Sequence, residues 1–148
     1  SLDAAINATE STFVARMDAD DVSLPGRLKA QSDYLLANPD VVVVSGQAQR
    51  IDHRGNYLGR MRLPAGERIR HELLRENVVV HPAVMFRRDA YLESGGYDVD
   101  LAMSEDYHLW LKMALLGEVT ILAEDLLLYR IHVNQATKRV KQTGPHLR

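Results

Sequence analysis

Three carboxylates lie within four positions near the start of the chain, directly after an apolar segment: Asp18, Asp20 and Asp21. Their mutual repulsion makes such a cluster unfavourable unless a cation, solvent or hydrogen-bond donors offset it. On an extended segment, side chains two residues apart share a face, so Asp18 and Asp20 can converge on one ligand. Carboxylate oxygens are hard ligands of the kind that Mg²⁺ and Mn²⁺ prefer. Two interpretations remain open, a divalent-metal site or a solvated turn that caps the next helix.

A second acidic group, Ser104-Glu105-Asp106, precedes an apolar stripe with helical spacing. Acids in the first turn of a helix complement its dipole and accept hydrogen bonds from its free N–H groups. A carboxylate in this place can also be a general base, which deprotonates a hydroxyl as that hydroxyl attacks an electrophile. The local pattern favours the cap and leaves the general base as the alternative.

Two histidines could complete a coordination sphere that an aspartate begins. His132 ends the segment Tyr-Arg-Ile-His at the end of a predicted strand, and His81 lies directly before Pro82. A lone histidine is more often a surface or packing residue than a ligand. The sequence has no Gly-rich phosphate loop, no Gly-x-Ser-x-Gly and no His-Glu-x-x-His segment.

Alternating helices and strands must position these groups. We predict helices over 1–10, 23–39, 66–77, 89–96 and 104–117, and strands over 11–17, 41–52, 57–63, 81–88, 119–123 and 126–132. Ser23, together with Asp21, is expected to cap the helix that follows the aspartates. The alternation predicts an α/β fold, and the aspartates follow a strand, where ligands bind in open α/β sheets.

Composition bounds the class of protein. The chain has 148 residues, which fits one domain with a core, and its formal net charge is -2. This near balance gives no support for a surface that binds nucleic acid or an anionic membrane. The absence of cysteine excludes disulfides and thiolate chemistry. No apolar run approaches the ~18 residues of a membrane helix.

Four stretches together resemble the family 2 glycosyltransferases of the GT-A fold. They occur in the family's order, and the resemblance covers roughly residues 3 to 137. The stretches are "ARMDADDVSLPGRLKAQSDYL", "HPAVMFRRDAYLESGGYD", "SEDYHLWLKMALLG" and "YRIHVNQAT". The resemblance implies a Rossmann-like GT-A sheet with flanking helices over residues 1–137, followed by a polar, basic tail over 138–148.

The resemblance also implies roles for the candidate residues. Asp18 matches the first acid of the family's Asp-x-Asp motif, near the nucleotide ribose. Asp20 matches the second, which coordinates a Mg²⁺ or Mn²⁺ ion on the donor's diphosphate. His132 matches a further metal or diphosphate contact, and His81 is added as a candidate contact to the donor. Asp106, with Glu105 beside it, matches the catalytic base of an inverting transfer from a nucleotide sugar to an acceptor hydroxyl.

One departure from the family is at the front. Members begin with strands that hold the nucleotide base, and this chain starts after the positions of those strands. We therefore expect a fragment with little activity of its own, whose exposed sheet edge favours homo-oligomers. The resemblance implies a carbohydrate or lipid-linked acceptor, no nucleic-acid partner, and a cytoplasmic location, at most peripheral at the inner membrane face. A non-catalytic binding module and a metal-dependent phosphohydrolase remain as alternatives.

Overall fold

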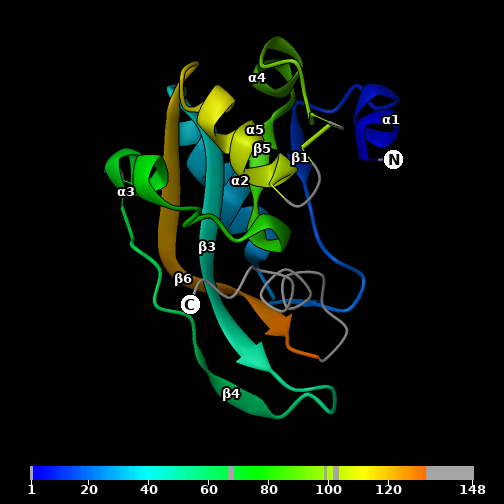
Figure 1. The fold of residues 1–148 in the computed structure, drawn as a ribbon, viewed down its shortest axis with the longest axis vertical. Coiled ribbons are helices and arrows are strands. Elements are labelled where there is room, and N and C mark those ends of the chain that lie inside the picture. Colours follow the sequence, from blue (N-terminus) through cyan, green and yellow to red (C-terminus); the bar gives the residue numbers. More distant parts are fainter. Residues whose placement is uncertain (1, 67–68, 99, 102–103, 133–148) are drawn as a thin grey trace, which may run out of the picture.

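The computed structural model describes residues 2–66, 69–98, 100–101 and 104–132 as a curled, mixed sheet with helices on both faces (Figure 1). Two long strands at its centre, β3 (Val41–Ile51) and β6 (Glu118–Arg130), run parallel. The strand order is β1-β5-β3-β6-β2, and β4 pairs with β3. The predicted α/β class is confirmed, while the predicted tail over 138–148 lies outside the described residues. No helix in the described part of the chain has the length and apolarity to cross a membrane.

The shorter elements surround these two strands. They are α1 (Leu2–Asn7), β1 (Phe13–Ala15), β2 (Val22–Ser23), α2 (Arg27–Ala37), β4 (Tyr57–Arg60), α3 (Arg70–Arg75), the 3-10 helix η1 (His81–Ala83), β5 (Met85–Arg87), α4 (Arg88–Glu93) and α5 (Glu105–Met113).

The two faces of the sheet bury different clusters of side chains. Successive residues of a strand point to opposite faces, and Val43 and Val44 of β3 do so. Val43 packs in a large cluster with Phe86 and with Trp110 of α5. Val44 packs in a smaller cluster with Leu35 of α2. In Figure 1, α5 accordingly lies in front of β3 and α2 lies behind it.

The helix after the aspartates begins later than predicted. Ser23 does not cap it, because Ser23 belongs to β2 and pairs with Leu127 of β6. The helix α2 starts at Arg27, and its N-cap is Gly26 in the left-handed conformation, with φ 81°. The caps predicted for Ser23 and Asp21 are therefore wrong. A two-residue strand is too short to show the alternation by which strands are recognised in a sequence.

The two short strands predicted near the end of the described chain form one strand, β6. The charged pair Glu124-Asp125 at its middle has the polarity typical of a turn. However, Asp125 accepts hydrogen bonds from Gln49 Nε2 (2.8 Å) and Arg60 Nε (2.7 Å). These long-range bonds keep the polar segment in the sheet. Next to it, β3 has Gly46, where an added Cβ would lie 2.4 Å from Leu126 Cδ1. The close approach of Leu126 thus explains the glycine.

Two buried polar side chains of α2 fasten the loop after β1 to the sheet. Arg27 Nη2 donates to the carbonyl oxygens of Arg16 and Val84 (2.7 and 3.2 Å). Its Nε donates to Gln31 Oε1 (3.0 Å), and Gln31 Nε2 donates to the carbonyl oxygen of Val44 (3.1 Å) and to one in η1 (2.8 Å). Buried donors need such partners, so this network fixes where the loop leaves the sheet.

Candidate functional site

The acidic loop, residues 16–21, brings the three predicted carboxylates together. One oxygen each of Asp18, Asp20 and Asp21 lies within 4.8 Å of the others. Arg16 Nη2 forms an ion pair with Asp18 Oδ1 at 2.6 Å, which offsets part of the repulsion. The carboxylate oxygens of the cluster are hard ligands of the kind that a divalent cation requires.

Asp21 is the buried member of the cluster, with 7% of its surface exposed. Its Oδ1 accepts a hydrogen bond from the backbone N–H of Arg130 (2.8 Å), whereas its Oδ2 is buried without a hydrogen-bond partner in the described structure. Burial raises the pKa of Asp21 to about 6, although the Arg130 bond opposes this. A cation would satisfy the unpartnered oxygen, so the residues present fit a divalent ion better than a solvated turn.

The end of β6 supplies a fourth candidate ligand. His132 Nε2 lies 2.9 Å from Asp20 Oδ2, and both side chains are partly exposed. An imidazole beside a carboxylate offers one nitrogen and one oxygen ligand at the same point. The structure therefore brings together Asp20 and His132, which the sequence offered as a possible histidine partner of an aspartate and the family resemblance placed at the metal site.

Arg130 holds this arrangement in place. Its backbone N–H binds Asp21, its Nε donates to the carbonyl oxygen of Asp20 (2.7 Å), and its Nη1 donates to the carbonyl oxygen of Asp52 (2.8 Å). The guanidinium thus joins the acidic loop to the turn between β3 and β4. Sequence reasoning did not single out Arg130, although it belongs to the quoted segment that ends in His132.

Replacing Arg130 should loosen the acidic loop without removing a ligand. We expect Arg130→Gln to weaken Mn²⁺ binding about 10-fold to 100-fold, as observed when groups that orient metal ligands are lost. Arg130→Lys should restore part of the affinity, because it keeps the charge and one donor. Calorimetric titration with Mn²⁺ measures both, and Arg60→Gln, which removes an arginine bound to Asp125, is the matched control. Equal affinities for Arg130→Gln and Arg60→Gln would contradict the positioning role.

The second acidic group lies at the start of α5. Asp106 Oδ2 accepts from Asn77 Nδ2 (3.0 Å), and Oδ1 accepts from the backbone N–H of Tyr107 (2.7 Å). Ser104 is the N-cap residue but makes no side-chain capping bond. Glu105 Oε2 is buried and has no hydrogen-bond partner in the described structure. The Asn77 bond fixes the direction of the Asp106 carboxylate, as a general base requires.

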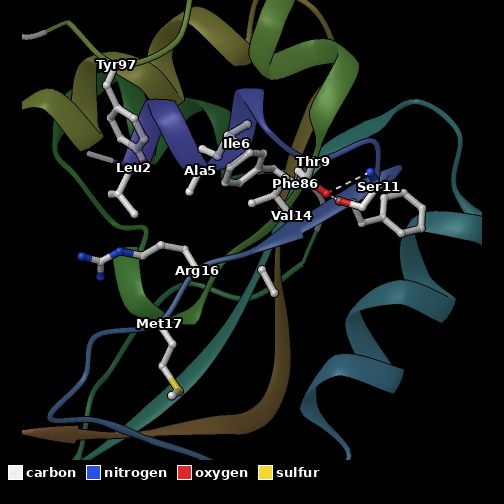
Figure 2. Close-up of a pocket in the computed structure, with 12 residues that line it drawn as sticks. Leu2, Ala5, Ile6, Thr9, Ser11, Val14, Arg16, Met17, Phe86 and Tyr97 are labelled. Carbon is white, nitrogen blue, oxygen red and sulfur yellow. Dashed lines mark hydrogen bonds between the residues drawn. The ribbon is translucent and has the colours of Figure 1, made fainter.

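Tyr97 and Arg16 line the same cavity. This cavity, of about 360 Å³, lies between α1, β1 and β5, and Figure 2 shows the two side chains along one side of it. Burial raises the pKa of Tyr97 above its usual range; the Arg16 cation opposes this shift, and Asp106 and Glu105 add to it. Tyr97 therefore lies within electrostatic reach of Arg16 and of the two acids at the start of α5. In the sequence, Tyr97 is marked only by its place after a Gly-Gly pair.

His81 lies apart from the acidic cluster, packed among aromatic rings. Its Nε2 is 2.8 Å from the Tyr97 hydroxyl, and its ring meets Trp110 edge-on with centroids 5.7 Å apart. Burial lowers the pKa of His81 to about 3, and the Arg16 cation acts in the same direction, so the ring is neutral. The contact to a donor predicted for His81 stays a prediction.

The neutral His81 ring should make the protein less stable in acid. Between pH about 6.5 and about 3, the unfolded chain binds a proton at this ring that the folded chain does not bind. The free energy of unfolding should fall by about 2 kcal/mol from this group between pH 7 and pH 5. Urea denaturation at both pH values should show a smaller fall for His81→Gln than for the unmodified chain. The exposed His71→Gln variant is the control, and an equal fall in all three chains would refute the assignment.

Comparison with known proteins defines the class. The family model "Glycosyltransferase like family 2" matches residues 1–144. The O-antigen biosynthesis glycosyltransferase WbnJ of Escherichia coli is 37% identical over 93% of this chain and 54% of its own length. The amylovoran biosynthesis glycosyltransferase AmsE of Erwinia amylovora is 34% identical over 86% of this chain and 47% of its own. The chain belongs to glycosyltransferase family 2, as predicted, and spans about half the length of these relatives.

The fold agrees with this assignment. The crystal structure of S. aureus TarS 1–349 superimposes with a TM-score of 0.62 over 86% of this chain and 38% of TarS, at 17% identity. The predicted glycosyltransferase fold, a curled sheet with flanking helices, is therefore confirmed. At this identity, the similarity shows the fold alone.

Proposed function

We propose that this chain carries the metal and diphosphate site of an inverting glycosyltransferase that uses a nucleotide-sugar donor. The observation that carries the proposal is the 2.9 Å contact between His132 and Asp20. It joins the end of β6 to the acidic loop and collects carboxylate and imidazole ligands at one point. Family membership supports sugar transfer as the chemistry of this site.

In this proposal, Asp20 and His132 would hold a Mg²⁺ or Mn²⁺ ion, and Asp18 would lie near the nucleotide ribose. The ion would neutralise charge on the diphosphate of the leaving nucleotide. Asp21 keeps the loop closed through its bond to the backbone of Arg130. Arg16 holds Asp18 in place through their ion pair. These contacts orient the donor end of the reaction before any substrate arrives.

Asp106 would act at the acceptor end. Its carboxylate, oriented by Asn77, takes the proton of the acceptor hydroxyl as the oxygen attacks the anomeric carbon. The bond to the diphosphate breaks in the same step, so the anomeric configuration inverts. Glu105 lies beside it in the first turn of α5. His81 is the further residue proposed to contact the donor.

The acceptor is proposed to be a lipid-linked sugar. One relative, 28% identical over 72% of this chain, is named UDP-Gal:alpha-D-GlcNAc-diphosphoundecaprenol beta-1,3-galactosyltransferase, from Escherichia coli. A free carbohydrate is the alternative acceptor, and its reaction would use the same donor site. A transfer assay with each acceptor distinguishes the two.

A transfer assay tests the proposal. The natural protein that contains this chain is supplied with Mn²⁺, a panel of nucleotide sugars, and either a diphosphate-lipid sugar or a free oligosaccharide. We expect release of nucleoside diphosphate only when the correct acceptor is present, and NMR of the product should show inversion. Acceptor-independent release of inorganic phosphate from p-nitrophenyl phosphate would instead indicate a phosphohydrolase. Binding of Mn²⁺ and nucleotide without either reaction would indicate a non-catalytic module.

A further inference from the structure

The β3–β4 hairpin is a rigid ribbon that extends from the body of the molecule (Figure 1). Its turn is built around Asp52, whose carboxylate accepts from the backbone N–H groups of Arg54 and Asn56 (both 2.8 Å) and from Asn56 Nδ2 (2.9 Å). Gly55 follows with φ 89°, a conformation that favours glycine. Because these bonds fix the turn, the side chains of the ribbon keep a defined direction.

Two neighbouring apolar side chains of β4 are exposed. Tyr57 has 63% and Leu58 51% of its surface accessible. The pairing of β4 with β3 passes from Gly59 to Tyr57, so Leu58 is an extra residue with no partner across the ladder. The end of the ribbon therefore carries two exposed apolar side chains, one aromatic and one aliphatic.

The same hairpin carries a local excess of positive charge. Residues 50–62 contain four arginines and one histidine against a single aspartate, although the whole chain has a net charge of -2. The Asp52 carboxylate accepts the hydrogen bonds that hold the turn, and Arg60 forms an ion pair with Asp125. The exposed cations that remain are Arg50, Arg54 and Arg62. Arg50 lies across the ribbon, with its Nη2 3.4 Å from the position of a Cβ on Gly59. The hairpin therefore carries three exposed arginines, although the chain as a whole has a small negative net charge.

We propose that this hairpin docks on an anionic phospholipid surface. Tyrosine and leucine side chains favour the boundary between lipid headgroups and acyl chains, and arginines bind the phosphates beside them. A bilayer accepts apolar and cationic groups at the same depth without needing a matching shape. A second copy of the chain is a poorer occupant, since a symmetric contact would set the arginines of one hairpin against those of the other.

Docking would bring the acidic loop to the membrane. Arg130 donates to the carbonyl oxygens of both Asp52 and Asp20, so the hairpin turn and the acidic loop are separated by one side chain. A lipid-linked acceptor, which is part of the proposed function, would then meet the site at the bilayer surface. The docking itself does not depend on that function, because it is measured without donor or acceptor.

Flotation with vesicles tests the proposal. We expect the chain to bind vesicles of phosphatidylcholine and phosphatidylglycerol in equal parts and not vesicles of phosphatidylcholine alone. High salt should weaken this binding, because exposed charges are screened. The double variant Arg54→Gln/Arg62→Gln should lose about 25-fold in affinity, at roughly five-fold per basic residue. Tyr57→Ser/Leu58→Ser should also lower the affinity, while the fold is checked by the fluorescence of Trp110, the single tryptophan, which is buried.

Matched controls lie on other surfaces. Leu36→Ser removes an exposed leucine of α2, and Lys29→Gln removes an exposed cation of the same helix. Both should bind vesicles like the unmodified chain.

In a further variant, Tyr57→Trp, the fluorescence of the added indole should be quenched by brominated lipids. Binding that is equal on neutral vesicles, or lost in the controls as much as in the hairpin variants, would overturn the proposal, as would no binding at all. A transfer assay on a soluble acceptor should be unchanged by the hairpin variants.

Discussion

In the natural protein that contains this chain, Asp106→Asn is expected to abolish measurable sugar transfer, while the affinity for the donor stays almost unchanged. The amide has nearly the shape of the carboxylate, and its oxygen can still accept one of the bonds that Asp106 makes to Asn77 and Tyr107. It cannot take a proton from a hydroxyl at neutral pH. Loss of a general base typically costs about 10²-fold to 10⁴-fold in rate. The expected signature is a fall in kcat with little change in donor binding.

The experiment combines initial rates with calorimetric titration of the nucleoside diphosphate. Asp100→Asn is the matched control, since it makes the same chemical change at an exposed position a few residues before α5. A variant at Asp106 that keeps normal activity would mean that this carboxylate only stabilises the start of the helix. A parallel loss of donor affinity would instead assign Asp106 to the binding of the donor.

Asp20→Ala is expected to remove metal-dependent binding of the nucleotide. Its carboxylate is the one that lies against both the acidic cluster and His132. The backbone carbonyl of Asp20, which accepts from Arg130, is kept in the variant, so the loop should remain attached to β6. Residues that only orient a metal ligand contribute about 10-fold to 100-fold to metal affinity. Loss of a direct ligand should therefore lower the Mn²⁺ affinity by more than about 100-fold.

Titration of Mn²⁺ alone, and then of nucleoside diphosphate in the presence of Mn²⁺, measures this effect. Asp33→Ala removes an exposed carboxylate on α2, paired with Lys29 and outside the acidic loop, and serves as the control. Unchanged Mn²⁺ affinity in Asp20→Ala would contradict the metal site. Loss of Mn²⁺ binding with normal nucleotide binding would mean that the donor binds without the help of the metal ion.

Local sequence patterns predicted the site only in part. The spacing of Asp18 and Asp20 was enough to predict that two carboxylates converge. The role of Asp21 was predicted wrongly, because its partner is a backbone N–H at the end of β6, more than a hundred residues away. No periodicity within one segment reports such a contact. The association of His132 with Asp20 came from the family resemblance and not from spacing.

The fold shows the same division. Helices α2 and α5 have apolar faces long enough to be recognised, and their positions were close to those predicted. The unity of β6 was missed because Asp125 carries the polarity of a turn and is held in the sheet by Gln49 and Arg60. Pairing between distant strands, and not the local strand propensity, therefore determines that this segment is a continuous strand.

The buried pair Arg27 and Gln31 bears on the dynamics of the acidic loop. Their hydrogen bonds join α2 to the end of β1, to η1 and to β3, so these elements form one cooperative unit. The backbone amides at the base of the loop should then exchange with solvent only when α2 itself unfolds. A nucleotide would meet a loop that is already ordered, and little conformational entropy would be lost when it binds.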